Sequence, residues 1–318
     1  MTNDARKSAS TRIRGLILSP FIGLSAAALF WSGNFIVGRL LRDSISPISL
    51  NFWRWTIALV ILLPFTYRLL IRHRRLILRY WRLIAALGLT GLASFHTCVY
   101  LALTTTTAVN ALLLISLAPL LILLLSWLML GEEMSRLQLA GIAVSFVGAV
   151  TLIAHGSLAA LLALHFGTGD LWILLAVVLW ATYCLLLKRR PKALPQLALL
   201  CASNIAAVLM MLPIYLVMLS SEKHFVLDQT VAWGILYIAL FASVIAFLLW
   251  NDGVAKIGAS KAGAFIYLMP VFGAILAFIF LDEKIALYQL GGGALIFLGI
   301  AVMNWKRRNP PEQTRIKF

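Results

Sequence analysis

Charged residues are scarce in this sequence of 318 residues. Only 12% of them are Asp, Glu, Lys or Arg, whereas 62% are hydrophobic. A soluble domain is roughly half apolar and about one-quarter charged, so this composition excludes a soluble enzyme or binding domain. An apolar helix needs about 20 residues to cross the hydrocarbon layer, which leaves room for about ten crossings and little else. We therefore expect an all-α membrane protein.

Cysteines and recognisable catalytic motifs are also lacking. The three cysteines, Cys98, Cys184 and Cys201, fall in apolar stretches without metal-like spacing, so neither a disulfide framework nor a zinc site is indicated. No G-x-x-x-x-G-K-S/T, H-E-x-x-H or G-x-S-x-G pattern occurs, which argues against a nucleotide-driven pump and against an intramembrane hydrolase. We expect no enzyme activity, no cofactor and no metal ion.

Acidic residues are few, and the net charge is +16. The basic residues stand in short clusters beside apolar runs, a pattern typical of signals that orient membrane spans rather than of a nucleic-acid surface. Alternate connections carry most of the Lys and Arg, and the opposite connections hold only Arg39, Arg42, Lys223 and Lys284. This bias predicts that both termini are cytoplasmic, which requires an even number of spans.

The apolar runs predict ten spans. They lie near residues 17–40, 48–70, 83–103, 106–130, 137–155, 170–188, 196–219, 231–250, 260–281 and 285–305. The expected organisation is a cytoplasmic tail at 1–16, a first five-helix repeat at 17–155, an external linker at 156–169, a second five-helix repeat at 170–305 and a cytoplasmic tail at 306–318.

The sequence contains an internal repeat, because residues 108–148 recur without a gap at 259–299. The matched pairs include Pro119 with Pro270, Glu132 with Glu283, Gly141 with Gly292, Phe146 with Phe297 and Gly148 with Gly299. Five spans per half is an odd number, so the second copy crosses the membrane in the opposite direction. Two inverted repeats of this kind are typical of transporters, with a binding cavity at their junction near mid-depth.

The repeated residues resemble a known family. The pattern Ala118-Pro119 through Leu130-Gly131-Glu132-Glu133 and Gln138-Leu139-Ala140-Gly141, with its second copy at Met269-Pro270 through Asp282-Glu283-Lys284 and Gly291-Gly292, looks like the drug/metabolite transporter superfamily. The closest resemblance is to its EamA-type ten-helix exporters. The resemblance implies export of small metabolites, commonly amino acids or related compounds, across a bacterial inner membrane.

Two ionisable residues inside the spans are candidates for recognition. Arg54 lies about one turn into the second span, where a cation costs about 3 kcal/mol on insertion scales. It either snorkels to the external headgroups or binds a substrate carboxylate. His96 is the only histidine well inside a span, and it either packs in the core or binds a proton, a carboxylate or an aromatic substrate. The equivalent positions in the second half are Ser203-Asn204 for Arg54 and Phe247 for His96.

Aromatic and amide side chains complete the predicted binding site. The candidates are Trp31, Asn34, Tyr100, Asn110, Trp180, Tyr183, Trp250 and Tyr267. Stacked rings with a few amides suit an amphipathic zwitterion or cation. Aromatic residues near span ends are also typical of interface belts, and the sequence leaves both possibilities open.

Other conserved pairs between the halves are better suited to structure. Pro119 and Pro270 fall near the middle of spans and are predicted either to kink the helices or to act as paired hinges. Small residues on one helix face predict close helix packing; these are Gly141, Ser145, Gly148, Gly292 and Gly299. The acidic turn residues Glu132, Glu133, Asp282 and Glu283 complement helix N-termini.

We therefore expect an exporter of small metabolites, with amino acids, aromatic ones included, as the leading substrates, working by alternating access. Its partners are the small-molecule substrate, the lipid bilayer and, if transport is coupled, protons. One alternative is an exchanger of phosphorylated or nucleotide-linked metabolites, which would need at least two cations in the cavity. The alternative from another class is a non-transporting scaffold or a membrane-embedded enzyme.

Overall fold

The computed structural model describes residues 19–106, 111, 114–131, 135–154, 157, 159, 167–219, 228–281 and 287–304. Within these ranges the chain forms helices and no strand. The elements are α2 (Pro20–Leu41), α3 (Pro47–Arg72), α4 (Arg74–Arg79), α5 (Trp81–Leu87), η1 (Gly88–Ser94), α6 (Phe95–Thr105), α8 (Ala118–Leu130), α9 (Arg136–Ile153), α11 (Thr168–Lys188), α12 (Gln196–Leu219), α13 (Gln229–Tyr237), η2 (Ile238–Ile245), α14 (Ala246–Ile257), α15 (Ala259–Gly263), η3 (Ala264–Tyr267), α16 (Leu268–Leu281) and α17 (Leu287–Asn304).

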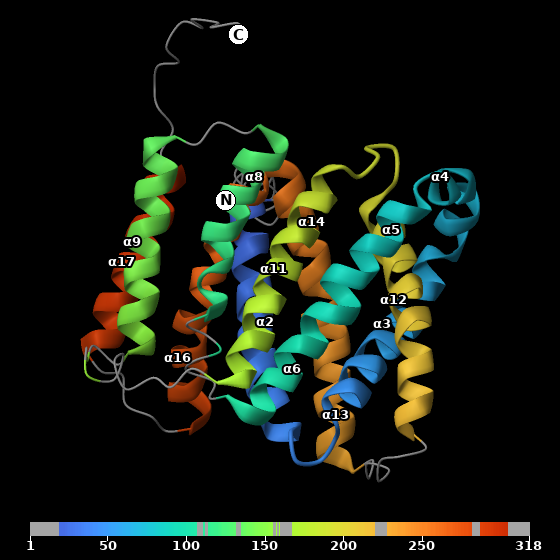
Figure 1. Cartoon of the computed structure of the whole chain (residues 1–318), viewed down its shortest axis with the longest axis horizontal. Coiled ribbons are helices and arrows are strands. Elements are labelled where there is room, and N and C mark those ends of the chain that lie inside the picture. The colour runs from blue at the N-terminus through green and yellow to red at the C-terminus, as the bar shows by residue number, and fades with distance from the viewer. Residues whose placement is uncertain are drawn as a thin grey trace, which may run out of the picture.

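These elements make the ten predicted spans, and the all-α membrane fold is confirmed. Six helical runs within the described residues are long and apolar enough to cross a membrane. The third, eighth and ninth spans are each built from consecutive elements, namely α5–η1–α6, α13–η2–α14 and α15–η3–α16. The helices stand side by side, and the start of α2 lies at the same end of the bundle as α4, the upper end in Figure 1.

Local sequence signals set the helix ends. Pro47 occupies the first turn of α3, and the side chain of Ser46 accepts a hydrogen bond from the backbone N–H of Ser49. Asp228 caps α13 in the same way, with its carboxylate 2.7 Å from the backbone N of Val231. Helix α8 ends at Gly131, whose φ of +62° is a left-handed conformation that favours glycine.

The two halves share their helix irregularities. The third and eighth spans each contain a π-helical segment, η1 and η2, at matching positions of the repeat. The fourth span has a turn at Ser116 and Leu117 before α8, and the ninth has the 3₁₀ segment η3 before α16. Interruptions of this kind leave backbone groups that need a polar partner or a cavity, so within a membrane they mark the interior of the protein.

The prolines of the repeat lie at these interruptions, near the middle of their spans. Pro119 and Pro270 were predicted either to kink the helices or to act as paired hinges. In the structure Pro119 is in the first turn of α8, and Pro270 is the third residue of α16. Each proline therefore lies where one helical segment is succeeded by the next, and Pro119 occupies the first turn, where a helix tolerates proline. Kinking prolines do occur within helices, at Pro64 of α3 and Pro213 of α12.

The crossing of α9 and α17 reveals the symmetry between the halves. A Cβ added at Gly141 would lie 2.5 Å from the carbonyl oxygen of Gly299, and one added at Gly148 would lie 2.6 Å from that of Gly292. The helices are therefore antiparallel. Moving along the chain by one repeat exchanges Gly141 with Gly292 and Gly148 with Gly299, so this contact maps onto itself. That is the behaviour expected at a two-fold axis between inverted repeats.

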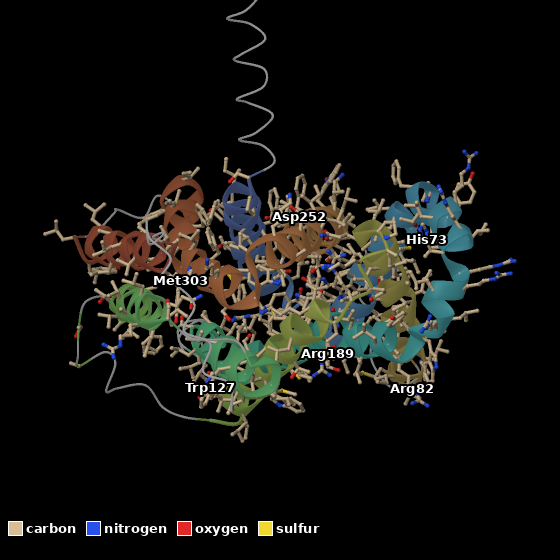
Figure 2. The ribbon with its side chains drawn as sticks, turned by 90° about the horizontal axis from the view of Figure 1, so that it is seen from above. His73, Arg82, Trp127, Arg189, Asp252 and Met303 are labelled. Atoms are coloured by element: carbon tan, nitrogen blue, oxygen red, sulfur yellow. The ribbon has the colours of Figure 1, made fainter. Side chains whose placement is uncertain are left out.

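The remaining helices interlock across the halves. Helix α2 packs on α14 and α16 of the second half, and α11 packs on α6 and α8 of the first in the corresponding manner. Helix α3 packs on α12. Seen from above in Figure 2, Met303 of α17 lies toward one end of the long axis and His73, at the end of α3, toward the other. The interlocked helices between them enclose the core.

The α9–α17 crossing gives a stability prediction. Substituting Gly148→Ala places a methyl group within 2.6 Å of backbone on α17, which cannot yield without separating the helices. We expect the free energy of unfolding to fall by about 1–3 kcal/mol, measured as a lower midpoint of thermal unfolding in detergent. Gly291→Ala on α17 is the control, because a Cβ there meets nothing within 4 Å. Equal effects of the two substitutions would contradict the proposed crossing.

Candidate functional site

A mostly apolar cavity lies at the junction of the two halves. It is lined by residues of α2, α6, α8, α11, η3 and α16 and by Ile115, which precedes α8. The lining residues are Trp31, Asn34, Phe35, Phe95, His96, Val99, Ile115, Ala118, Val177, Trp180, Ile266 and Met269. The irregular backbone ahead of both repeated prolines thus faces the cavity, as the membrane setting requires.

The two repeats supply matching parts of the wall. Ile115 and Ile266 are equivalent positions of the repeat and both line the cavity, as do Ala118 and Met269. Trp31 of α2 and Trp180 of α11 hold equivalent places and meet edge to face, with ring centroids 5.1 Å apart. The cavity therefore lies on the pseudo-two-fold relation between the halves, where inverted-repeat transporters bind their substrates.

Arg54 lies directly behind this wall, completely buried. Its Nε donates to Ser243 Oγ at 2.9 Å, and its Nη1 donates to Tyr100 Oη at 2.9 Å and to Asn34 Oδ1 at 3.4 Å. Its Nη2 reaches only the carbonyl oxygen of Ala242, at 3.5 Å. We call these four partners the guanidinium cage. Full burial excludes snorkelling to the headgroups, one of the two possibilities that the sequence left open.

The guanidinium cage contains no negative charge. All four partners of Arg54 are neutral, and no acidic side chain among the described residues forms an ion pair with it. Its charge is further screened only by the face of Trp55, whose ring centroid is 5.2 Å from Cζ. A buried cation usually has a carboxylate partner. Arg54 thus resembles a binding group whose counter-ion comes from outside the protein.

His96 lines the cavity in front of the cage. Its side chain is 3% exposed, and its Nδ1 has no hydrogen-bond partner among the described residues. The imidazole is surrounded by the rings of Phe95, Tyr100 and Phe247, at centroid distances of 4.7, 6.3 and 5.9 Å. A buried polar atom without a partner is unfavourable unless a ligand or water completes it. His96 therefore stays a candidate binding residue in the cavity wall.

The candidate tryptophans form a buried cluster rather than an interface belt. Trp31 contacts Trp250 as well as Trp180, at a centroid distance of 5.2 Å, and its indole N–H donates to Ala242 O at 3.0 Å. Trp180 stacks on Tyr183, whose hydroxyl donates to Asn251 Oδ1 at 2.7 Å. Trp180 and Trp250 are no more than 3% exposed. The cluster gives the cavity a rigid aromatic side.

The structure brings most of the predicted residues together, some in the cavity wall and others behind it. Trp31, Asn34, His96 and Trp180 line the cavity; Arg54, Tyr100, Tyr183 and Trp250 pack behind them. Tyr267 is fully buried outside the lining, and its hydroxyl has no partner among the described residues. Asn110 and the acidic residues Glu132, Glu133, Asp282 and Glu283 lie outside the described residues.

Sequence reasoning missed several cavity and cage residues. Phe35, Phe95, Val99 and Val177 line the cavity but look like ordinary span residues in the sequence. Ser243 and the carbonyl of Ala242 hold the guanidinium, and only their place in the repeat of the third span could have drawn attention to them. Asn51 was also missed. It is fully buried and donates to Ala93 O at 2.8 Å, beside η1.

Comparison with known proteins gives consistent matches over the whole chain. The model of the EamA-like transporter family matches residues 18–154 and again residues 167–305. The uncharacterized transporter YyaM of Bacillus subtilis is 30% identical over 305 residues, which cover 94% of this chain and 97% of the relative. A probable terminal-alkyne amino-acid exporter of Streptantibioticus cattleyicolor is 28% identical, covering 86% of this chain and 89% of the relative.

A solved structure shares the fold. It is described only as the crystal structure of a protein, and it matches with a TM-score of 0.74 at 21% sequence identity, covering 90% of this chain and 96% of its own. At this level of identity the likeness concerns the arrangement of helices alone.

The neutral cage predicts an unusual effect of removing Arg54. Without it Tyr100 still donates to Asn34 Oδ1, and Ser243 still donates to Ile238 O, so no cage hydroxyl is left without an acceptor. We expect Arg54→Met to unfold at a midpoint equal to or above that of the parent protein, because an uncompensated buried charge is lost and methionine fills the space.

Ser243→Ala is the matched control. It keeps the charge but removes the acceptor of Nε, so we expect it to lower the free energy of unfolding by about 2 kcal/mol. Thermal unfolding of both purified variants in detergent provides the measurement. A large loss of stability in Arg54→Met would identify Arg54 as a structural group instead.

Proposed function

Because the chain belongs to the EamA-like transporter family, we propose that it exports small amphipathic metabolites, led by amino acids and related compounds, through the cavity between its halves. The protein is a membrane transporter and not an enzyme. Its substrate is a small molecule and its surroundings are the lipid bilayer. The substrate class is supported by the site and by a relative named as a probable amino-acid exporter.

The observation that carries this proposal is the position of Arg54. A fully buried guanidinium with neutral partners stands behind an apolar, aromatic cavity. Amino acids and their derivatives share a carboxylate and an apolar part, which match the cage and the aromatic wall respectively. A carboxylate that enters the cavity would be attracted by a cation that has no acidic partner. The attraction is strong because the site has a low dielectric constant.

Transport in this proposal follows alternating access. The two halves rock about the α9–α17 crossing, which lies on the two-fold relation and where glycines of the two helices approach each other closely. The helix interruptions ahead of Pro119 and Pro270 lie in the cavity wall, where they can act as paired hinges. The cavity would then open alternately to each side while its wall keeps the same residues.

The orientation is a proposal as well. Helix α2, the first described helix, starts at the end of the bundle where α4 lies (Figure 1). Helix α4 belongs to the arginine-rich segment 68–82. Basic connections favour the cytoplasm, so we assign this end to the cytoplasm and place the protein in a bacterial inner membrane. The organisation into tails 1–16 and 306–318, repeats 17–155 and 170–305 and an external linker 156–169 follows from the same assignment.

Exchange of phosphorylated metabolites is less well supported. A phosphate carries more charge than one arginine comfortably offsets. Among the described residues Arg54 is the only Lys or Arg that is buried, and Lys261 in α15 is not buried and does not line the cavity. We therefore prefer a substrate with a single carboxylate.

Reconstituted vesicles test the proposal. Vesicles loaded with a panel of labelled amino acids and their derivatives should release at least one of them about tenfold faster than empty-membrane controls. Arg54→Met should abolish this release, because it removes the cation without removing the cavity. Folding of each variant is checked by size-exclusion chromatography.

A second substitution uses the internal repeat as its guide. His96→Phe introduces the residue found at the equivalent position, Phe247. We expect it to slow release while preserving stability, because it keeps an aromatic ring in the cavity wall and removes the two imidazole nitrogens. Gly291→Ala, at an exposed position, should transport like the parent protein.

The proposal fails if no compound of the panel is released faster than from vesicles without protein. Repeating the assay with a pH gradient shows whether protons are coupled.

A further inference from the structure

The charge balance of the cavity points to a preference among the proposed substrates. None of its twelve lining residues is acidic. A transporter built for a free amino acid has to accommodate an ammonium group as well as a carboxylate. In a low-dielectric site an unpaired ammonium is costly to bury, unless an acid or an ordered set of acceptors receives it.

The described acids lie away from this site. Asp43 pairs with Arg42 at the surface, and Asp252 pairs with Lys256 at 2.6 Å with its side chain 40% exposed. Asp228 caps α13, and Asp170 caps α11 while accepting from Thr106 Oγ1 at 2.5 Å. Each carboxylate is thus engaged at a helix end or at the surface. The other acids of the sequence lie outside the described residues.

The guanidinium cage also has spare capacity for an anion. A guanidinium carries five N–H donors, of which Nη2 holds two. The only acceptor of Nη2 is the carbonyl oxygen of Ala242 at 3.5 Å, and that oxygen already accepts from Trp31 Nε1 at 3.0 Å. Trp31 lines the cavity, so the least satisfied part of Arg54 lies next to the cavity wall.

We propose that the cavity selects amphipathic monocarboxylates whose amine is absent or blocked, such as 2-oxo acids, N-acylated amino acids or simple aryl and branched alkyl acids, over the free zwitterions. This inference rests on the proposed function and sharpens its substrate class. The carboxylate neutralises Arg54, and the apolar part contacts Trp31, Trp180 and their neighbours. A free ammonium near Arg54 meets repulsion and no acid.

Binding of matched ligands to the protein in lipid nanodiscs tests the preference. One set shares a phenyl group and comprises 3-phenylpropanoate, phenylalanine and 2-phenylethylamine. A second set shares an isobutyl group and comprises 4-methylpentanoate, leucine and isopentylamine. Dissociation constants come from quenching of tryptophan fluorescence, which the buried cluster should report. We expect each carboxylate to bind about tenfold tighter than its amino acid, with the amine weakest.

Two variants connect the preference to the cage. Arg54→Met should reduce the difference between carboxylate and amino acid to less than about threefold. Asn34→Asp is nearly isosteric and places a carboxylate where Oδ1 now lies, 3.4 Å from Nη1, so it provides an internal counter-ion. It should weaken binding of the carboxylates about tenfold relative to the amines, and it does not require the loss of any side chain.

The outcomes separate this inference from the proposed function. If the amino acids bind as tightly as the carboxylates or more tightly, the selection for anions is overturned while amino-acid export stands. If the preference survives both variants, its assignment to the guanidinium cage is overturned. If no member of either set binds, the inference is overturned, and release from the loaded vesicles then decides the proposed function independently.

Discussion

A positive charge buried within the hydrocarbon layer has to be solvated by the protein itself, because neither water nor headgroups reach it. Arg54 meets this constraint with oxygens from α2, α6 and η2, so elements of both halves converge on one side chain. The π-helical turn of η2 brings the Ala242 carbonyl and Ser243 to the guanidinium. Helix α2, helix α6 and the eighth span therefore meet at the guanidinium of α3, directly behind the cavity wall.

Much of the fold was predictable because the membrane limits what a sequence can do. Bilayer thickness fixes the length of a span, so apolar runs locate helices such as α12, predicted and observed at 196–219. Five spans per repeat make the second copy inverted by parity alone, and the α9–α17 crossing has the symmetry that this inversion requires. The small residues of that crossing could be recognised from their spacing, because close approach in lipid depends on them.

The polar members and the large aromatic residues of the site were predictable, but their arrangement was not. Arg54 and His96 stood out because ionisable groups are rare within spans, but their surroundings could not be predicted. The partners of Arg54 are 20, 46, 188 and 189 residues away in the sequence, and the π-helical segments have no recognised sequence signal. The prolines were placed correctly within the spans but not within the helices, because an apolar sequence does not reveal where one helix stops and another starts.

The place equivalent to Arg54 shows how a symmetric scaffold can carry an asymmetric site. In the second half this place is Ser203 of α12. Helix α12 packs on η1, just as α3 packs on η2. A Cβ at Gly88, the first residue of η1, would lie 2.5 Å from the carbonyl oxygen of Ser203, so the two backbones are already in close contact. The second half therefore carries a serine at the place where the first half carries a guanidinium. In the proposed function, a substrate between the halves has Arg54 behind the wall on one side only, so its orientation is set by the protein rather than by the symmetry of the repeat.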